Sequence, residues 1–264
     1  EHVLMRRLAG LGRNPLRRAY AFLEARKLKA WERRVNGRAQ LAMVCSETDR
    51  ELLARLCPST WIAVVPNTIE VETYSPAPEG EAGRLVFTGT MNWIPNQDAL
   101  VFFADYILPE LQRLIPGVRF VAAGRPPAEE FRRRFVGRPV HFTGVVPDMR
   151  TELARASVCV VPLRVGSGTR FKILEAAAMA KPIVSTRLGA EGLDFIPGQE
   201  IILEDDARRF ARAVAELLND PARRLTLGQA ARRRVERQYT FPVLCAALKR
   251  ALEEAFQPRL ETTL

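Results

Sequence analysis

Cysteine and histidine are scarce in this chain of 264 residues, which has four of the first and two of the second. No two of the cysteines have CxxC spacing, and two histidines are too few to complete a zinc constellation with them. Scattered thiols of this kind are typical of reduced, mostly buried cysteines in a cytosolic protein. The scarcity therefore argues against a zinc site and against a disulfide framework.

Long apolar runs are also absent. No stretch approaches the ~20 residues that span a bilayer, and no signal peptide is visible. The chain contains no low-complexity segment and no internal repeat, and 47% hydrophobic with 27% charged residues is typical of a globular protein. The first residue is Glu1, with a helical pattern already under way, so we expect the chain to be a piece of a longer protein.

Acidic residues are few at the start of the chain. Residues 1–40 hold eleven basic and three acidic residues, and so carry +8 of the net charge of +10. Leucines and aromatic residues such as Tyr20 and Trp31 lie between the charges. This basic, partly amphipathic stretch is compatible with an anionic membrane surface, with a nucleic acid, or with a solvated helix face. Nothing in it resembles a nucleic-acid recognition module, and we expect no nucleic-acid partner.

Short apolar runs rich in β-branched residues alternate with amphipathic helical patterns along the rest of the chain. Such alternation implies βαβ units, and it predicts the α/β class with a doubly wound parallel sheet. A linker-like segment at 73–83, which holds two prolines and two glycines, divides the chain. The predicted strands are 41–46, 62–65, 85–88, 118–123, 140–143, 158–162, 183–185 and 201–203. The predicted helices are 47–56, 96–114, 128–135, 149–156, 170–180, 207–218, 222–238 and 242–256.

Glycine loops follow most of these strands, where ligands bind on parallel sheets. They lie at 89–96, 124–127, 144–148, 164–169 and 186–192. The loop at 164–169, with the sequence RVGSGT, opens a helix that carries Arg170, Lys172 and Glu175. Free backbone N–H groups at a helix N-terminus attract anions, and phosphate is the anion most often bound in this way.

These segments resemble the nucleotide-sugar-binding domain of the group 1 glycosyltransferases, which are retaining enzymes of GT-B fold. The matching pieces are 87–89, 95–96, 120–124, 140–148, 160–163, 166–176 and 181–184, with 44–47 and 65–69 upstream. Within the family they most resemble bacterial exopolysaccharide sugar transferases. The resemblance implies a Rossmann-like donor domain at 84–240 and the end of the acceptor-side domain at 1–72. It also implies a C-terminal helix at 241–264 that packs back toward that first domain.

The resemblance implies a hexosyltransferase. We expect it in the cytoplasm, and on the inner face of the membrane if the basic residues 1–40 bind lipid. The donor is a UDP-, GDP- or ADP-sugar, and the acceptor is a glycan or a lipid-linked glycan. No cofactor and no metal are expected, because GT-B enzymes use protein groups for the leaving group and the chain has no DxD motif near a strand end. With most of the acceptor-side domain missing, we expect the chain to bind donor better than it transfers sugar.

The second glutamate of the family signature matches Glu175, which the resemblance makes the ligand of the donor ribose. The first falls on Ser167, which is uncharged. Either the sugar is recognised differently in this subgroup, or the backbone N–H groups of Gly168, Thr169, Arg170 and Phe171 do most of the work. Where relatives have an Arg and a Lys that hold the diphosphate, this chain has Thr90 and Pro95. The charge is then expected from Arg170 and Lys172, as catalytic residues, or from Arg164 or Arg125. The first loop offers Gly89, Asn92 and Asn96, and the base is expected over Gly144, Val145 and Val146. His141, inside a strand pattern, is expected to be structural.

Three other functions are compatible with parts of this pattern. A nucleotide-sugar epimerase shares the two-domain fold, but this half supplies few of the acidic and histidine residues that it needs. An NAD-binding domain would explain Gly166-Ser167-Gly168, but Phe171 stands in place of the third glycine and the loop follows a fourth strand, not a first. A nucleotide-sugar-binding module without catalysis is favoured by Ser167 and by the missing Arg and Lys.

Overall fold

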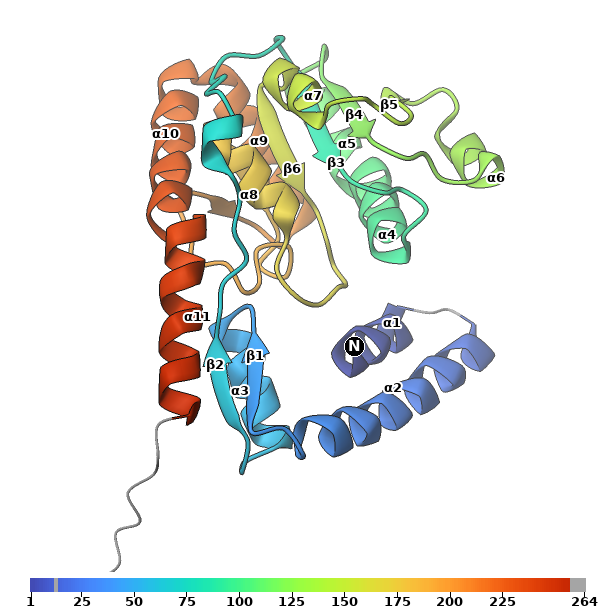
Figure 1. Ribbon diagram of the computed structural model, residues 1–264. Helices are drawn as coiled ribbons and strands as arrows, with labels where there is room; N and C mark the ends of the chain where they lie inside the picture. The colour runs from blue at the N-terminus through green and yellow to red at the C-terminus, as the bar shows by residue number, and fades with distance from the viewer. Residues whose placement is uncertain (12–13, 257–264) are drawn as a thin grey trace, which may run out of the picture. The chain divides into compact units, whose positions relative to one another are not determined.

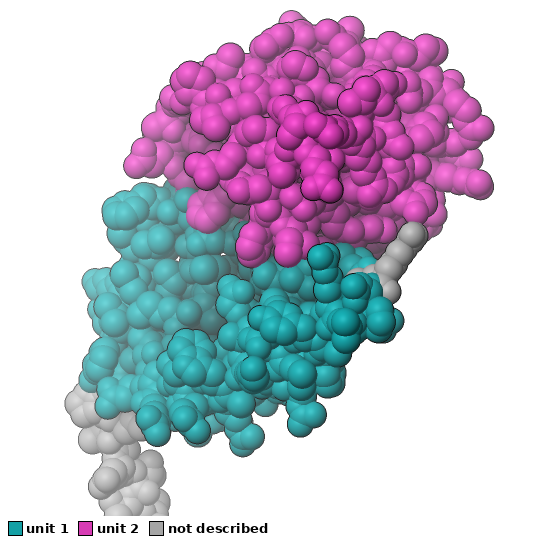
Figure 2. All heavy atoms as spheres, turned by 90° about the vertical axis from the view of Figure 1, so that its right-hand side faces the viewer, with its two compact units in different colours: residues 1–68, 167–169, 238–264 teal, residues 69–166, 170–237 magenta. Residues whose placement is uncertain are grey.

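The structure is a computed structural model that describes residues 1–11 and 14–256, and it divides into two compact units (Figure 2). Unit 1 holds residues 1–68, 167–169 and the described residues from 238 onward, and unit 2 holds 69–166 and 170–237. The domain division expected from the sequence stays a prediction. Residues 257–264 of the expected C-terminal helix lie outside the described residues.

Unit 1 is built on two short parallel strands, β1 (Leu41–Val44) and β2 (Trp61–Val64), with a helix between them in the chain. Ser46 begins that helix as its N-cap, because its Oγ accepts from the backbone N–H of Asp49 at 3.1 Å. The C-terminal helix packs against β2. The helices of unit 1 are α1 (His2–Leu11), α2 (Pro15–Asn36), α3 (Glu47–Leu56) and α11 (Phe241–Phe256).

Unit 2 contains a parallel sheet of six strands in the order β5-β4-β3-β6-β7-β8 (Figure 1). The central strand β3 is buried at every position, and its middle three residues, Leu85 to Phe87, are apolar. The strands are β3 (Arg84–Thr88), β4 (Arg119–Ala123), β5 (Val140–Phe142), β6 (Val158–Val161), β7 (Ile183–Ser185) and β8 (Ile202–Leu203). This topology confirms the predicted α/β class with a doubly wound parallel sheet.

Helices lie on both faces of the sheet. The segment after β3 packs with α9 on one face, and α9 contacts β6 and β7. The crossovers through α7 and α8 run in the opposite direction along the sheet, and right-handed connection therefore places them on the other face. The helices of unit 2 are α4 (Ile94–Phe102), α5 (Leu108–Leu114), α6 (Glu129–Arg132), α7 (Met149–Arg155), α8 (Phe171–Ala178), α9 (Ala207–Asn219) and α10 (Pro221–Gln238).

One predicted helix is interrupted. The sequence predicts a continuous helix over 96–114, but a π-helical segment, Phe103–Ile107, separates α4 from α5. Pro109 is the second residue of α5. In an α-helix a proline there cannot donate to the carbonyl of Asp105, and its ring would collide with that carbonyl. The wider π turn relieves both problems. Two short 3-10 turns, Val71–Thr73 and Arg133–Phe135, complete the unit.

The direction of winding reverses between β3 and β6, the two strands at the centre of the sheet. The chain moves from β3 outward through β4 and β5, then returns to β6 and continues through β7 and β8. A crevice opens outside the carboxyl ends of the strands at such a switch point. The loops after β3 and β6 flank it, and both hold residues that the sequence predicts to bind the donor.

Two of the four cysteines are exposed, so the expectation of mostly buried thiols is only half correct. Cys57 and Cys159 are buried, while Cys45 and Cys245 are exposed, and all four are free thiols. Burial raises the pKa of Cys159 to about 12, which makes its thiol chemically inert.

Candidate functional site

Lys172, in the first turn of α8, lies beside the loop that follows β3. Its Nζ donates to Asn96 Oδ1 at 3.1 Å and stands 3.9 Å from the centroid of the Phe87 ring. Asn96 is itself fixed, because its Nδ2 donates to the carbonyl of Thr90 at 2.8 Å. A Cβ placed on Gly89 would lie 3.1 Å from this Nζ and 3.0 Å from Asn96 Nδ2. The ammonium is therefore held directly against the first glycine loop.

The environment of Lys172 disfavours its charge. Burial first, and then the nearby positive charge of Arg170, lower the pKa of Lys172 to about 7, although the carboxylate of Glu175 opposes the change in part. An anion bound at this point would supply the missing counter-charge and raise the pKa again. A lysine poised in this way near the switch point is a candidate for anion binding.

Arg170 is buried at 8% exposure, at the N-cap position of α8. Its guanidinium lies over Gly166, since a Cβ on that glycine would be 2.3 Å from Arg170 Nη2. Gly166 has φ +152°, which also favours glycine. Arg170 is thus folded onto the glycine loop and is not part of a solvated helix face, and its predicted role at the diphosphate stays a prediction.

Glu175 lies one turn further along α8 and is half-buried. The hydroxyl of Tyr74 donates to its Oε1 at 3.4 Å. Burial raises the pKa of Glu175, while the hydrogen bond from Tyr74 and the charge of Lys172 oppose that rise. The structure thus places Lys172 and Glu175 on one helix at a spacing of three residues, which puts them on one face.

Three glycine loops meet at the carboxyl edge of the sheet. Gly89 donates from its N–H to the carbonyl of Ala123 at 2.9 Å, and a Cβ on Gly124 would lie 2.2 Å from Gly89 O. Gly124 also pairs with Gly144 in an isolated bridge. The close approach requires glycine at position 124, where φ is +124°. The first, second and third predicted loops are therefore contiguous.

The other side chains predicted to bind the donor lie on these loops. Thr90 and Asn92 are exposed, as is Arg125, whose backbone carbonyl accepts from Met91 N at 2.8 Å. Val145 is 74% exposed, and Val146 next to it is partly exposed. Their roles stay predictions. Phe171, which begins α8, is 52% exposed.

The middle of the loop after β6 belongs to a different unit from the rest of that loop. Ser167, Gly168 and Thr169 group with unit 1, and Asn67 Nδ2 donates to Thr169 Oγ1 within that unit. Their role at the donor stays a prediction.

Arg164, the alternative source of phosphate-binding charge, is already engaged. It donates to Asp98 from Nη2 at 2.6 Å and from Nε at 3.1 Å, and its guanidinium lies 4.5 Å from the centroid of Phe102. Arg170 and Lys172 remain the better placed cations. His141 is exposed on the edge strand β5.

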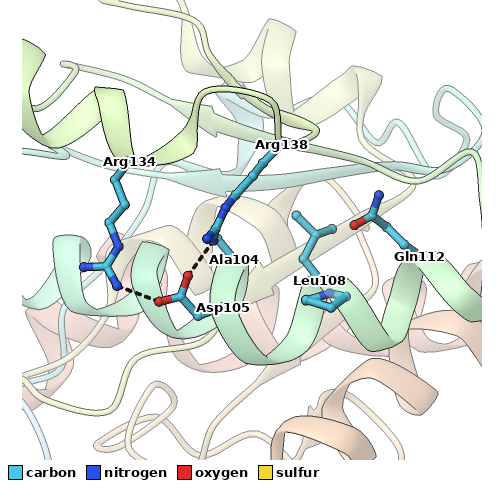
Figure 3. A pocket seen from close by; sticks show the side chains of 7 residues that line it. Ala104, Asp105, Leu108, Gln112, Arg134 and Arg138 are labelled. Atoms are coloured by element: carbon cyan, nitrogen blue, oxygen red, sulfur yellow. Dashed lines mark hydrogen bonds and ion pairs between the residues drawn. The ribbon is translucent and has the colours of Figure 1, made fainter.

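A pocket of about 440 Å³ lies elsewhere in unit 2, against the π-helical segment (Figure 3). Asp105 stands in it between Arg134 and Arg138 and forms ion pairs with both. The pocket shares no residue with the glycine loops. It is lined by Ala104, Asp105, Leu108, Pro109, Gln112, Arg134 and Arg138.

Within residues 1–11 and 14–256, no group of three or more His, Cys, Asp and Glu side chains is arranged to hold a metal ion. None of the helices in these ranges has the length and apolar character needed to cross a membrane.

Comparison with known proteins places these features in a family context. Residues 82–220 match a family model described as "Glycosyl transferases group 1". A GDP-mannose-dependent monoacylated alpha-(1-6)-phosphatidylinositol monomannoside mannosyltransferase of Corynebacterium glutamicum is 26% identical over 220 residues, covering 74% of this chain and 56% of the relative. A glycogen synthase of Mycobacterium tuberculosis is 27% identical over 217 residues, covering 75% and 51%. The chain spans about half the length of the curated relatives it matches.

Solved structures with a similar fold include a sucrose-phosphate synthase from Thermosynechococcus elongatus. It has a TM-score of 0.73 and 20% identity, and the match covers 97% of this chain and 66% of that one. Anabaena HepE in complex with UDP and glucose has a TM-score of 0.71 and 14% identity, with coverage of 86% and 66%. At these identities the likeness shows the fold alone.

Proposed function

The chain belongs to the group 1 glycosyl transferases, and from that membership we propose that it acts in the transfer of a sugar from a nucleotide-diphosphate sugar to a glycan or lipid-linked acceptor. The proposed reaction retains the anomeric configuration and needs no metal. The observation that carries the proposal is Lys172, whose ammonium is held against Gly89 at the switch point of the sheet. The relatives named above include a GDP-mannose-dependent enzyme, and a structural neighbour binds UDP.

In the proposed mechanism Lys172 and Arg170 stabilise the diphosphate as it leaves the sugar. The negative charge on the diphosphate grows as the glycosidic bond breaks, so cations fixed in advance lower the barrier to that step. The dipole of α8, whose N-terminus lies at Arg170, adds to the same field. Arg suits the diphosphate through its planar fork, and Lys acts as a point charge.

The identity of the donor's nucleobase is the first point to establish. Thermal unfolding in the presence of UDP-, GDP- and ADP-sugars reports affinity, because a ligand that binds the folded state raises Tm. We expect one of the three to stabilise the protein clearly more than the others. The proposal would fail if none of them did.

The ribose ligand in this proposal is Glu175. Its carboxylate can accept from both vicinal hydroxyls. We expect Glu175→Ala to weaken nucleotide-sugar binding by about tenfold to a hundredfold, the range for lost hydrogen bonds to a charged acceptor. Isothermal calorimetry measures this, with Glu130→Ala on the exposed side of α6 as control. Unchanged affinity in Glu175→Ala would remove Glu175 from the donor site.

Two other functions remain as alternatives on the same fold. A binding module without catalysis is favoured by Ser167 in the place of the expected glutamate. Transfer and donor-hydrolysis assays on the full-length protein separate it from an enzyme, since a module binds donor with no turnover. An epimerase would convert the sugar of the donor without any acceptor.

We also propose that the protein lies at the cytoplasmic face of an anionic membrane through α2. Leu16, Tyr20, Leu23 and Trp31 share one face of this helix at helical spacing, and each is more than half exposed. Exposed cations stand on or beside this face: Arg26, Lys27, Arg33 and Arg34. An apolar stripe with aromatic residues and flanking cations is typical of helices that lie in a membrane interface.

Liposome flotation tests this. Full-length protein is expected to float with vesicles that contain an anionic phospholipid and to stay behind with neutral vesicles. Changing Arg26, Lys27 and Arg34 to Gln should lower the partition coefficient by about a hundredfold, at ~1 kcal/mol for each cation near the surface. Arg208, Arg212 and Arg233, which are exposed in unit 2, provide the matched triple control. Binding that is indifferent to anionic lipid and to α2 would leave this helix as a solvated surface.

A further inference from the structure

Tyr74 follows the 3-10 turn that precedes β3, and it approaches the predicted ribose ligand from a distant part of the sequence. Its hydroxyl donates to Glu175 Oε1 at 3.4 Å, across 101 residues of chain. The side chain is half-buried. Neither the motif spacing nor the glycine loops of the sequence indicated this residue, because it lies in segment 73–83, which is predicted to be a linker.

The backbone of Tyr74 is tied to the helix that carries Glu175. Arg232 Nη1 donates to the carbonyl of Tyr74 at 2.7 Å and also to the carbonyl of Ala178 at the end of α8. The N–H of Tyr74 donates to Val71 O at 3.0 Å. One guanidinium thus fixes the tyrosine and α8 to each other, and the phenol has a defined position relative to the carboxylate.

The ring of Tyr74 is held from its other side by Arg150 of α7. The Arg150 guanidinium lies 6.0 Å from the ring centroid and donates to Thr73 O at 2.7 Å. Arg150 is in turn paired with Asp148, which caps α7 at the end of the loop predicted to receive the base. Tyr74 is therefore in contact with the predicted ribose carboxylate and, through Arg150 and Asp148, is connected to the predicted base loop.

A phenol at this point limits how the carboxylate can turn. A carboxylate with no hydrogen-bond partner rotates easily about its last torsion angle. A vicinal diol is bound best when the carboxylate keeps one orientation, in which an oxygen with unused lone pairs faces the two hydroxyls. A hydrogen bond to Oε1 selects one orientation and leaves Oε2 with its lone pairs. We propose that Tyr74 is a positioning residue of the donor site, whose hydroxyl orients the Glu175 carboxylate toward the ribose diol of the nucleotide. The inference rests on the proposed function of Glu175.

The hydrogen bond has a second consequence for Glu175. Burial raises the pKa of this carboxyl, and the bond from Tyr74 lowers it toward its ordinary value, as does the charge of Lys172. The pKa of Tyr74 is raised, by burial first and by the charge of Glu175, while Arg150 lowers it and Asp148 raises it. The phenol is therefore protonated at neutral pH and available as a donor.

The test compares ribonucleotides with their 2′,3′-dideoxy counterparts, using UDP, GDP and ADP as probes. Wild-type protein should bind the ribonucleotide more tightly, and Tyr74→Phe, which removes only the hydroxyl, should reduce that preference by about threefold to tenfold. Binding of the dideoxy nucleotide should be unchanged. Tyr106→Phe, on the exposed side of the π-helical segment, is the matched control.

The pH profile gives a second readout. Without the hydroxyl the pKa of Glu175 rises further, so in Tyr74→Phe the ribonucleotide preference should disappear at a higher pH on acidification than in wild type. A purely structural role would weaken both nucleotides equally and leave the profile where it was, and that result would overturn the inference.

Glu175→Gln separates the two levels of the proposal. Loss of the ribose preference in Glu175→Gln with full preference retained in Tyr74→Phe refutes the role of Tyr74 and leaves the proposed function standing. An unchanged preference in Glu175→Gln refutes the ribose role itself. A wild-type protein that binds none of UDP, GDP and ADP overturns the proposed function and this inference with it.

Discussion

Replacing Lys172 with methionine is expected to lower kcat/KM for the nucleotide sugar by about two to three orders of magnitude, the loss seen when one preorganised donor to a developing negative charge is removed. The effect is large because the ammonium is fixed before any donor arrives, between Asn96 Oδ1 and the ring of Phe87. Methionine has nearly the same length and keeps an apolar contact with the ring. The measured loss therefore reports the charge and not the packing.

The same lysine should give the reaction a basic limb in its pH dependence. In the protein without bound donor, the pKa of Lys172 is lowered to about 7, mainly by burial. The side chain is therefore mostly a charged ammonium at pH 6 and mostly a neutral amine at pH 8. Because kcat/KM follows the ionisation of the free enzyme, it should fall as pH rises through 7, by up to about tenfold for each pH unit. Lys172→Arg keeps its charge throughout this range and should flatten that limb.

Two outcomes would contradict the role of Lys172. One is a Lys172→Met protein that retains kcat/KM within a few-fold of wild type. The other is equal loss of binding for a nucleoside and for its diphosphate, because removal of a phosphate contact should spare the nucleoside. Lys249→Met provides the control, since this lysine lies on the surface of α11 with its side chain 77% exposed.

The sheet of unit 2 was predictable from the sequence because its signals are local. Most strands are short, mainly apolar runs such as Val158–Val161. Most of the loops that follow them at the carboxyl edge of the sheet contain glycine. The prediction was wrong within 96–114, where the helical periodicity continues through Pro109 but the backbone widens into a π turn. The apolar pattern survives such a turn almost unchanged, so periodicity alone does not reveal it.

The candidate site was predictable only in part. Glu175, Lys172 and the glycines have motif positions, and three of the glycine loops do meet at the carboxyl edge of the sheet. The partners that fix these side chains have no such signal. Phe87 reads as an ordinary core residue of a strand, and Tyr74 reads as part of a linker. Their contacts depend on segments 85 and 101 residues apart, which only the tertiary structure brings together.

Lys181 shows the same limit for stability. It lies just before β7 and is fully buried, with 0% exposure. Its Nζ donates at 2.7 Å to each of three backbone carbonyls, those of Glu79, Ala154 and Ala156. Two of these acceptors belong to the end of α7, where helical carbonyls have no partner further along the helix. One ammonium thus joins β7, the end of α7 and the segment that leads into β3.

Lys181→Met is therefore expected to destabilise the protein by about 3–5 kcal/mol, because it leaves buried acceptors without donors while filling nearly the same volume. That is a large share of the ~5–15 kcal/mol that stabilises a typical domain. Urea unfolding monitored by circular dichroism measures the change as a lower midpoint. Lys249→Met should shift the free energy of unfolding by less than about 0.5 kcal/mol, as a substitution at an exposed lysine does. A loss below about 1 kcal/mol in Lys181→Met would mean that water reaches the three carbonyls and replaces the ammonium.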